Sequence, residues 1–401
     1  MKYVDIVPLI GGMSIAMGKA LGGTRPEAIV SYSPFEASDS HLLNYYNHEV
    51  PYIQLDKGGV IGEIHPDIVA ATCPCSGLSQ AHNRYGDGNP NNEWMIKTAK
   101  YVLGEVKPEV FWGENAPALI TGIGKNVRAQ LHAIAKENGY AMSIYKTKSK
   151  MHGGPQIRQR TFYFFWKRGK VPLMNRFDRQ HQTIEECLNS VTTNFQHDPI
   201  NKRTPTKDDP YYRYILDKLA PECSTHADFV KKVAGKYEKS IDLLSYIQGN
   251  GPKWTEISPW MIDNGFDREA AKCDRRQLKV DAGKGYMRHS TIIPRDHIGA
   301  FVIQYPACLT HPTLDRYITY REAMTIMGLP SDFELLNPEK SSNHICQNVP
   351  IQTATDLAGE VVATLNDQRD WIDASLFFQY NTNGKTQVVE SNSRSYEMEG
   401  I

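Results

Sequence analysis

The feature that most constrains the fold is a cysteine placed directly after a short apolar run, in residues 68–79. Ile68-Val69-Ala70-Ala71 is typical of a buried strand, and Pro74 imposes an extended or turn conformation just before Cys75. A thiol on the loop after a central strand lies where open α/β sheets bind ligands. The segment therefore predicts either a nucleophile at Cys75 or a buried structural cysteine. Other motifs along the chain are needed to distinguish these two possibilities.

The first 20 residues show the strand, glycine turn and helix that open a nucleotide-binding sheet. Gly11 and Gly12 follow an apolar run at residues 3–7 and precede a helical stretch that ends at Ala20. Glycines there let the backbone approach a ligand, and the helix N-terminus offers unpaired N–H groups. Strands and helices alternate to Trp166, which favours an α/β fold with a mostly parallel sheet. The expected strands are residues 28–32, 52–55, 68–71, 110–112, 141–145 and 161–166, and the expected helices are residues 94–103 and 125–137.

Two carboxylates follow expected strands at positions suited to a nucleoside. Glu36 comes shortly after the second strand, where an acidic residue can bind the hydroxyls of a ribose. It could equally be a carboxylate that is favoured at a helix N-terminus by the helix dipole. Asp56 follows the third strand and is a similar candidate.

From Lys167 to about Pro312, prolines, short helices and polar turns replace the regular alternation. Within this region, residues 271–300 hold seven basic and three acidic side chains, a local excess of +4. We expect this stretch, with Arg275 and Arg276, to contact phosphates, although a solvated helix face has the same composition.

Regular structure returns beyond Arg316. Thr319 followed three residues later by Glu322 predicts a capping box, and a further helix is expected at residues 351–365. Strand-like runs on either side of Asn383-Gly384 predict a β-hairpin.

Composition limits the class of protein and its partners. The 401 residues include 45 basic and 45 acidic side chains, so a nucleic-acid site must be a local patch. The chain has no membrane-length apolar run and no signal-peptide pattern, so we expect cytoplasmic residence. We also expect a monomer. Its seven cysteines are scattered and lack Cys-x-x-Cys spacing, so neither a disulfide framework nor a metal site is expected.

Five motifs, taken in order from residue 1 to about 365, resemble those of the C5-cytosine DNA methyltransferases of bacteria and phages. The similar segments are Pro74-Cys75 with Ser79, Glu114-Asn115, Gln156-x-Arg158-x-Arg160, Arg316-x-x-Thr319-x-Arg321-Glu322 with Gly328-x-Pro330, and Gln347-Asn348-Val349-Pro350.

This resemblance implies a Rossmann-like sheet that binds S-adenosylmethionine, with a smaller inserted target-recognition domain. The implied domains are a catalytic domain at 1–166, a target-recognition domain at 167–312, a return to the catalytic domain at 313–370, and a C-terminal hairpin or tail at 371–401. The cofactor would lie against the turn at residues 7–12, with Glu36 on its ribose and Asp56 near its adenine. The other implied cofactor contacts are Val7, Leu9, Gly11, Gly12, Pro74, Asn348 and Val349.

The resemblance also implies the catalytic roles. Cys75 would add to C6 of a cytosine flipped out of double-stranded DNA. Arg160 would favour the thiolate and bind the base O2, and Arg158, on the same side, would be mainly structural. Glu114 would contact N3 and the exocyclic amine of the base. The loop at 80–92 would close over the base, and Ser79, Asn115 and Gln156 would complete the substrate site.

The chain departs from the family pattern at the cofactor pocket. Val7 and Leu9 replace the Phe and first Gly of Phe-x-Gly-x-Gly-Gly, and Gln347 precedes Asn348 where the family usually has Gly. Weaker cofactor binding or a reshaped pocket is therefore expected. Two alternatives remain: the tRNA-methylating branch of the same family, whose insert is much shorter than the roughly 145 residues here, and a non-catalytic DNA-binding relative.

Overall fold

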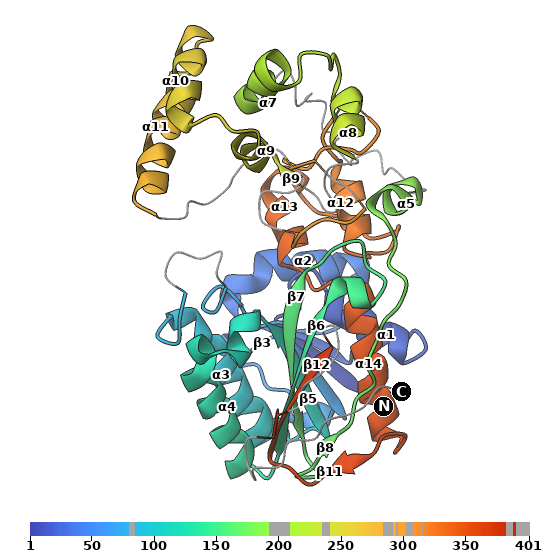
Figure 1. Cartoon of the computed structure of the whole chain (residues 1–401). Helices are drawn as coiled ribbons and strands as arrows, with labels where there is room; N and C mark the ends of the chain where they lie inside the picture. Colours follow the sequence, from blue (N-terminus) through green and yellow to red (C-terminus); the bar gives the residue numbers. More distant parts are fainter. Residues whose placement is uncertain are drawn as a thin grey trace. The chain divides into compact units, whose positions relative to one another are not determined.

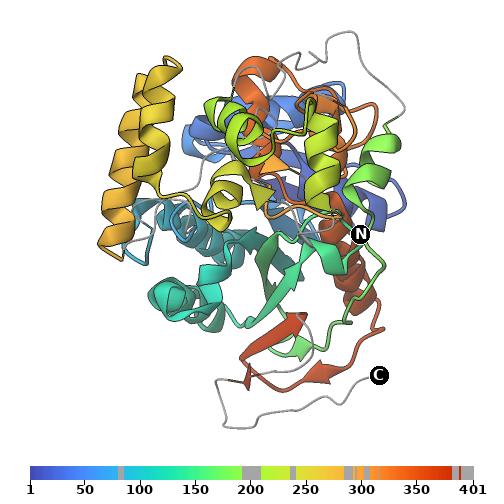
Figure 2. The same ribbon diagram turned by 45° about the horizontal axis from the view of Figure 1, so that its top comes forward.

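The computed structural model describes residues 1–79, 85–191, 209–234, 241–283, 292–293, 296–301, 308–314, 316–381 and 388–389. The chain forms two compact units (Figures 1 and 2). The first contains residues 1–181 and 327–401, and the second is the continuous segment 182–326. The second unit is thus inserted into the first.

The first unit is built on a nine-stranded sheet with the order β13-β12-β6-β7-β5-β4-β1-β2-β3 in the described part of the chain. Neighbouring strands are parallel, except that β7 runs antiparallel to β5 and β6, and β13 runs antiparallel to β12. The expected mostly parallel α/β sheet is confirmed. The strands are β1 Tyr3–Ile6, β2 Ala28–Ser31, β3 Tyr52–Gln54, β4 Ile68–Ala71, β5 Val110–Asn115, β6 Ala141–Lys148, β7 Gln159–Trp166, β12 Leu376–Asn381 and β13 Val388–Val389.

Helices cover both faces of this sheet, as in a Rossmann-like three-layer fold (Figure 1). On one face, α3 (Glu93–Tyr101) and α4 (Lys125–Glu137) pack over side chains such as Val69 and Phe111. On the other, α1 (Gly12–Ala20) and α14 (Ile351–Leu365) pack over Ile68 and Trp112. Both faces are therefore buried, which explains why β4 and the first half of β5 are continuously apolar.

Two further helices belong to the first unit. They are α2 (Glu36–Tyr45), which follows β2, and α13 (Pro338–Gln347), which precedes α14. His41 on α2 and His344 on α13 join them through a 3.1 Å contact between Nε2 and Nδ1.

The C-terminal segment is part of the sheet. β12 runs parallel to β6 and pairs in antiparallel register with β13, so the predicted hairpin pairing is confirmed, while Asn383-Gly384 lies outside the described residues. A separate antiparallel pair is formed by β8 (Val171–Pro172), which follows β7, and β11 (Trp371–Ile372), which precedes β12. Two amide side chains of β12 also bind backbone N–H groups. Gln379 accepts from Met174 N–H at 3.3 Å, and Asn381 accepts from Phe177 N–H at 3.3 Å.

The second unit is mostly helical and has its own core. α10 and α11 lie side by side as an antiparallel pair joined by residues 264–266 (Figures 1 and 2). Thr319 and Glu322 form the predicted capping box, in which Thr319 N–H donates to Glu322 at 2.7 Å and Glu322 N–H donates to Thr319 at 3.1 Å. Its elements are α5 Ile184–Asn189, α7 Pro210–Tyr214, α8 His226–Ala234, β9 Ile241–Asp242, α9 Leu243–Gly249, α10 Trp254–Asp263, α11 Asp267–Asp281, β10 Ile292–Ile293 and α12 Tyr320–Ile326.

Candidate active site

The catalytic candidates gather at one edge of the sheet because their strands are neighbours. Cys75 follows β4, whose Ala71 pairs with Gly113 of β5, so Glu114 lies at the same edge. Asn115 of β5 pairs with Thr161 of the antiparallel β7, which brings Arg160 to that edge as well. Three motifs separated by some 40 residues each are thus brought together by strand order.

Glu114 and Arg160 form an ion pair beside the thiol. Arg160 Nε lies 2.5 Å from Glu114 Oε1, and the Glu114 side chain is 2% exposed. Burial raises the pKa of Cys75 above its ordinary value; Arg160, and more weakly Arg158, lower this pKa, whereas Glu114 raises it. Cys75 itself is partly exposed, unlike the buried Cys73. The site therefore holds a thiol whose ionisation depends on how the Glu114 and Arg160 charges are balanced.

Arg158 and Gln156 lie deeper than Arg160, before β7 begins. Arg158 Nη1 donates to the backbone oxygen of Cys346 at 2.8 Å, and Gln156 Nε2 lies 3.2 Å from Met327 Sδ. Both side chains are buried. These contacts tie β7 to the return segment of the chain and are structural in character.

The remaining substrate candidates are also engaged with the protein. Asn115 is buried, and its Oδ1 accepts from the following Ala116 N–H at 2.8 Å. Ser79 is half-buried. Residues 80–84 of the expected closing loop lie outside the described residues. Their direct contact with a substrate stays a prediction.

The turn after β1 has a backbone that suits glycine although the sequence has other residues. Val7 and Leu9 have φ of 53° and 56°, in the left-handed region where branched and bulky side chains are strained. Leu9 stands where the resemblance expects Gly, a residue that adopts this backbone without strain. Gly11, with φ of 95°, caps α1, and a Cβ there would lie 2.4 Å from Leu42 Cδ1.

Asn348 completes this turn from the far end of the sequence. Gly12 N–H donates to Asn348 Oδ1 at 2.9 Å, and a Cβ on Gly12 would lie 2.4 Å from that oxygen and from the Val349 carbonyl. Asn348 Nδ2 is buried and has no hydrogen-bond partner among the described residues. A donor of this kind beside a glycine turn and a helix N-terminus without a side-chain cap fits a ligand with polar or carboxylate groups.

The two carboxylates expected to bind a nucleoside differ in their surroundings. Glu36 lies in the first turn of α2, is 61% exposed and accepts from Gln54 Nε2 at 3.3 Å. Asp56 accepts the Ser33 N–H at 3.0 and 3.1 Å, which fixes the chain after β2. Pro74 is half-buried at the end of β4.

A third carboxylate, which the sequence did not single out, lies beneath the turn. Asp39 on α2 is fully buried, and Tyr52 Oη donates to its Oδ2 at 3.0 Å. Burial raises the pKa of Asp39 to about 7, and burial together with Asp39 raises the pKa of Asp5 well above its ordinary range. Asp39 precedes the buried Leu42 by three residues, and this helical spacing is the signal that could have placed it on the inner face of α2.

In the second unit, the two arginines predicted to contact phosphates have different surroundings. Arg275 is exposed on α11. The Arg276 guanidinium lies 5.1 Å from the Tyr211 ring centre and 5.2 Å from that of Trp254, and it donates to Tyr211 Oη. Arg276 therefore packs inside the unit. Lys284, Arg288 and Arg295 of the same basic stretch lie outside the described residues.

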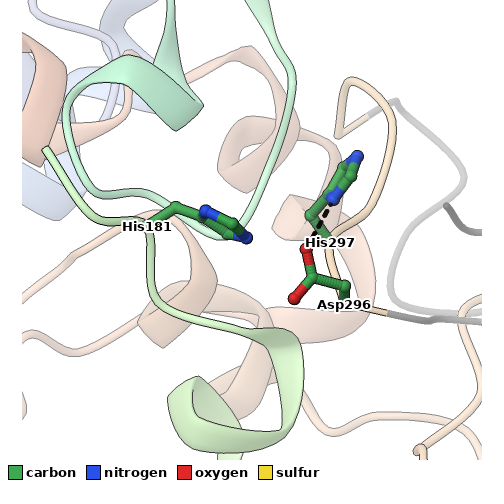
Figure 3. Close-up of side chains that lie close together, drawn as sticks. All are labelled: His181, Asp296 and His297. Carbon is green, nitrogen blue, oxygen red and sulfur yellow. Dashed lines mark hydrogen bonds and ion pairs between the residues drawn. The ribbon is translucent and has the colours of Figure 1, made fainter. Parts of the chain in front are cut away.

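Figure 3 shows side chains of a type that often binds metals. Asp296 and His297 belong to the second unit, and His297 Nδ1 lies 3.0 Å from Asp296 Oδ2. This pair by itself is a hydrogen-bonded contact and not a complete ligand set; His181, drawn with it, ends the first unit. In the described parts of the chain, every helix is too short or too polar to cross a membrane.

Comparison with known proteins agrees with this geometry. The chain is 24% identical over 206 residues to the type II methyltransferase M.HgiDI of Herpetosiphon aurantiacus, covering 49% of this chain and 64% of that protein. It is 30% identical over 140 residues to the type II methyltransferase M.AgeI of Thalassovita gelatinovora, covering 35% and 29%. The chain thus matches less than two thirds of either relative.

Solved structures share the fold over nearly the whole chain. A prophage-encoded protein of Escherichia coli, assigned as a DNA modification methyltransferase, aligns with a TM-score of 0.56 and 17% identity, covering 91% of this chain and 99% of that one. The Entamoeba histolytica methyltransferase EhMeth aligns with a TM-score of 0.55 and 12% identity, covering 91% and 98%. A sequence model described as C-5 cytosine-specific DNA methylase matches residues 1–363, and the chain therefore belongs to the C-5 cytosine-specific DNA methylase family.

Proposed function

We propose that the protein transfers a methyl group from S-adenosylmethionine to C5 of cytosine in double-stranded DNA. The observation that carries this proposal is a partly exposed thiol, Cys75, beside a buried Glu114–Arg160 ion pair at the carboxyl edge of a parallel sheet. Family membership supplies the reaction class, and the site supplies residues of the right chemistry in one place.

Cytosine C5 is a weak nucleophile, so the base must first be activated. Addition of the Cys75 thiolate to C6 turns the ring into an enamine-like species whose C5 can attack an electrophile. Glu114 binds N3 and the exocyclic amine of the base. Because Glu114 raises the pKa of Cys75, engaging its charge with the base leaves Arg160 free to favour the thiolate. After transfer, the C5 proton leaves and the thiol is expelled by elimination.

We assign the cofactor to the turn at residues 7–12. The buried Nδ2 of Asn348 and the α1 N-terminus offer donors, and Gly11 and Gly12 let Leu42 and Asn348 pack directly against the turn. The cofactor, when bound, supplies an electrophilic methyl group. Leu9 and Val7 leave the pocket with fewer aromatic contacts than the family pattern, so binding weaker than is usual for the family is expected.

The second unit is proposed to recognise the DNA sequence around the target. It is one continuous insertion with a separate core, and it carries the exposed Arg275 on a helix pair. A stacked base cannot reach a thiol, so the cytosine must rotate out of the duplex before Cys75 attacks.

The test is covalent trapping. DNA carrying 5-fluorocytosine at the target blocks the final elimination, because fluorine cannot leave as the proton does. Wild-type protein with S-adenosylmethionine should form a stable complex in a denaturing gel, Cys75→Ser should not, and Cys73→Ser should. Trapping by Cys75→Ser would remove Cys75 from the mechanism.

Two further assays separate the alternatives. Transfer of a tritiated methyl group to DNA but not to tRNA distinguishes the two branches of the family. Calorimetry with S-adenosylmethionine tests the non-catalytic alternative, which predicts no binding.

A further inference from the structure

Two adjacent asparagines hold the turn that carries Cys75. Asn91 Nδ2 donates to Ser76 Oγ at 2.7 Å, one residue beyond the thiol. Asn92 packs against Gly77 so closely that a Cβ on Gly77 would lie 2.1 Å from Asn92 Oδ1. The turn after Cys75 is therefore built against the residues that begin α3.

Asn92 also binds the segment that leads into α3. Its Nδ2 donates to the carbonyl oxygens of Gly86 at 2.9 Å and Asp87 at 3.2 Å. Gly86 N–H in turn donates to Gly77 O at 2.8 Å. Asn92 is 4% exposed, so these bonds are shielded from water. The buried Asn92 amide thus joins the segment that follows Cys75 to the segment that leads into α3.

The same returning segment is attached to the helix that follows the Glu114 strand. The Asp87 carboxylate accepts the backbone N–H of Asn126 at 3.1 Å and of Val127 at 3.2 Å, in the first turn of α4. The segment after β4 and the helix after β5 are therefore connected through residues 86–92. This connection is a hydrogen-bonded path between the supports of Cys75 and of Glu114.

We propose that Asn92 is a positioning residue for Cys75, and that its two donated hydrogen bonds fix the thiol relative to Glu114 and Arg160. The proposal rests on the methyl-transfer function above. A nucleophile on a loop must be held in place to react, and a displacement of about 1 Å can reduce the rate by about a hundredfold.

The chain offers a matched pair of variants. Asn92→Asp keeps the shape of the side chain, but a carboxylate cannot donate to the carbonyls of Gly86 and Asp87. Asn91→Asp makes the same change one residue away, yet Ser76 can reverse its hydroxyl and donate to the new carboxylate. Both positions lie at the N-terminus of α3, so the added charge meets a similar helix dipole.

The experiment measures alkylation and turnover in the intact protein. With iodoacetamide and peptide mass spectrometry, Cys75 in Asn92→Asp should react about threefold faster or more, because the loosened turn exposes the thiol, while the buried Cys73 stays protected. Methyl transfer to DNA should fall by about tenfold or more in kcat, with the KM for S-adenosylmethionine within about twofold of wild type. Asn91→Asp should behave like wild type in both assays.

The proposal is overturned if Asn92→Asp alkylates Cys75 at the wild-type rate and turns over as Asn91→Asp does. If Cys73 becomes labelled, Asn92→Asp has unfolded, and Gly77→Ala decides instead. That variant pushes on the same amide from the other side and must reproduce faster alkylation with lower kcat; wild-type values would reject the proposal. Alkylation needs neither DNA nor cofactor, so a failure of the proposed function is seen separately, as no methyl transfer by the wild type.

Discussion

At the scale of single residues, Asp39 links ionisation to the stability of the protein. It is buried between α2 and the sheet, and burial raises its pKa to about 7. An aspartate in an unfolded chain has a pKa of about 3.9. Between these two values the folded protein keeps a proton that the unfolded chain has released, so stability falls as pH rises from about 4 to 7 and then levels off.

Asp39→Asn should remove that dependence while keeping an acceptor for Tyr52 Oη. The free energy of unfolding of wild type minus that of the variant should therefore decrease across this range by at most about 1.4 kcal/mol per pH unit. Urea unfolding of both proteins at several pH values measures the difference. Parallel curves for wild type and Asp39→Asn would contradict the assignment.

At the scale of elements, two of the arginines on α11, Arg275 and Arg276, have different expected roles. Arg275 is exposed, whereas Arg276 packs on Tyr211 and Trp254. Arg275→Ala should weaken binding to all DNA sequences alike and reduce the log–log salt slope by about one unit for each phosphate that the arginine neutralises. Arg276→Ala should instead lower the melting temperature of the protein. An unchanged slope for Arg275→Ala, measured by fluorescence anisotropy over a salt series, would mean that this face is only solvated.

Elements with a strong local pattern were predictable from the sequence. The limits of α4 and α14 agree with the expected 125–137 and 351–365, because apolar periodicity and end signals lie within each helix. The meeting of Cys75, Glu114 and Arg160 required the family resemblance as well, since strand order is not local.

Other features had no local signal. The pairing of β12 with β6 joins segments more than 200 residues apart. The left-handed backbone at Val7 and Leu9 could not be predicted from the sequence, because glycine, the residue that usually indicates this conformation, is absent from both positions. Asn92 was missed because an asparagine in a polar segment is ordinary until its buried partners are known.

At the scale of the whole molecule, the match to the family model ends at residue 363, whereas the central sheet includes strands beyond that residue. β12 extends the first unit, and Leu376, Phe377 and Phe378 are buried in the cores on the two sides of the sheet. Gln379 and Asn381 brace residues 174 and 177. The segment beyond the family domain therefore completes the first unit.

Phe377→Ala should destabilise the protein by about 3–5 kcal/mol, because it empties a fully buried aromatic site. Thermal unfolding measures the loss, and Tyr380→Ala, at a half-buried position of the same strand, should cost much less. A stop codon after residue 370 should have a larger effect than either. Equal melting temperatures for the Phe377→Ala and wild-type proteins would show that β12 is an accessory strand.

The bond between Gly12 and Asn348 has a consequence for protein synthesis. It joins residues 336 positions apart, and the proposed cofactor pocket is incomplete until Asn348 and the helix after it have left the ribosome. A nascent chain, although it already contains Cys75, Glu114 and Arg160, lacks the pocket in which a methyl donor would be held. Products that terminate before Asn348 would likewise lack this pocket, so only chains extended beyond that residue could acquire the proposed activity.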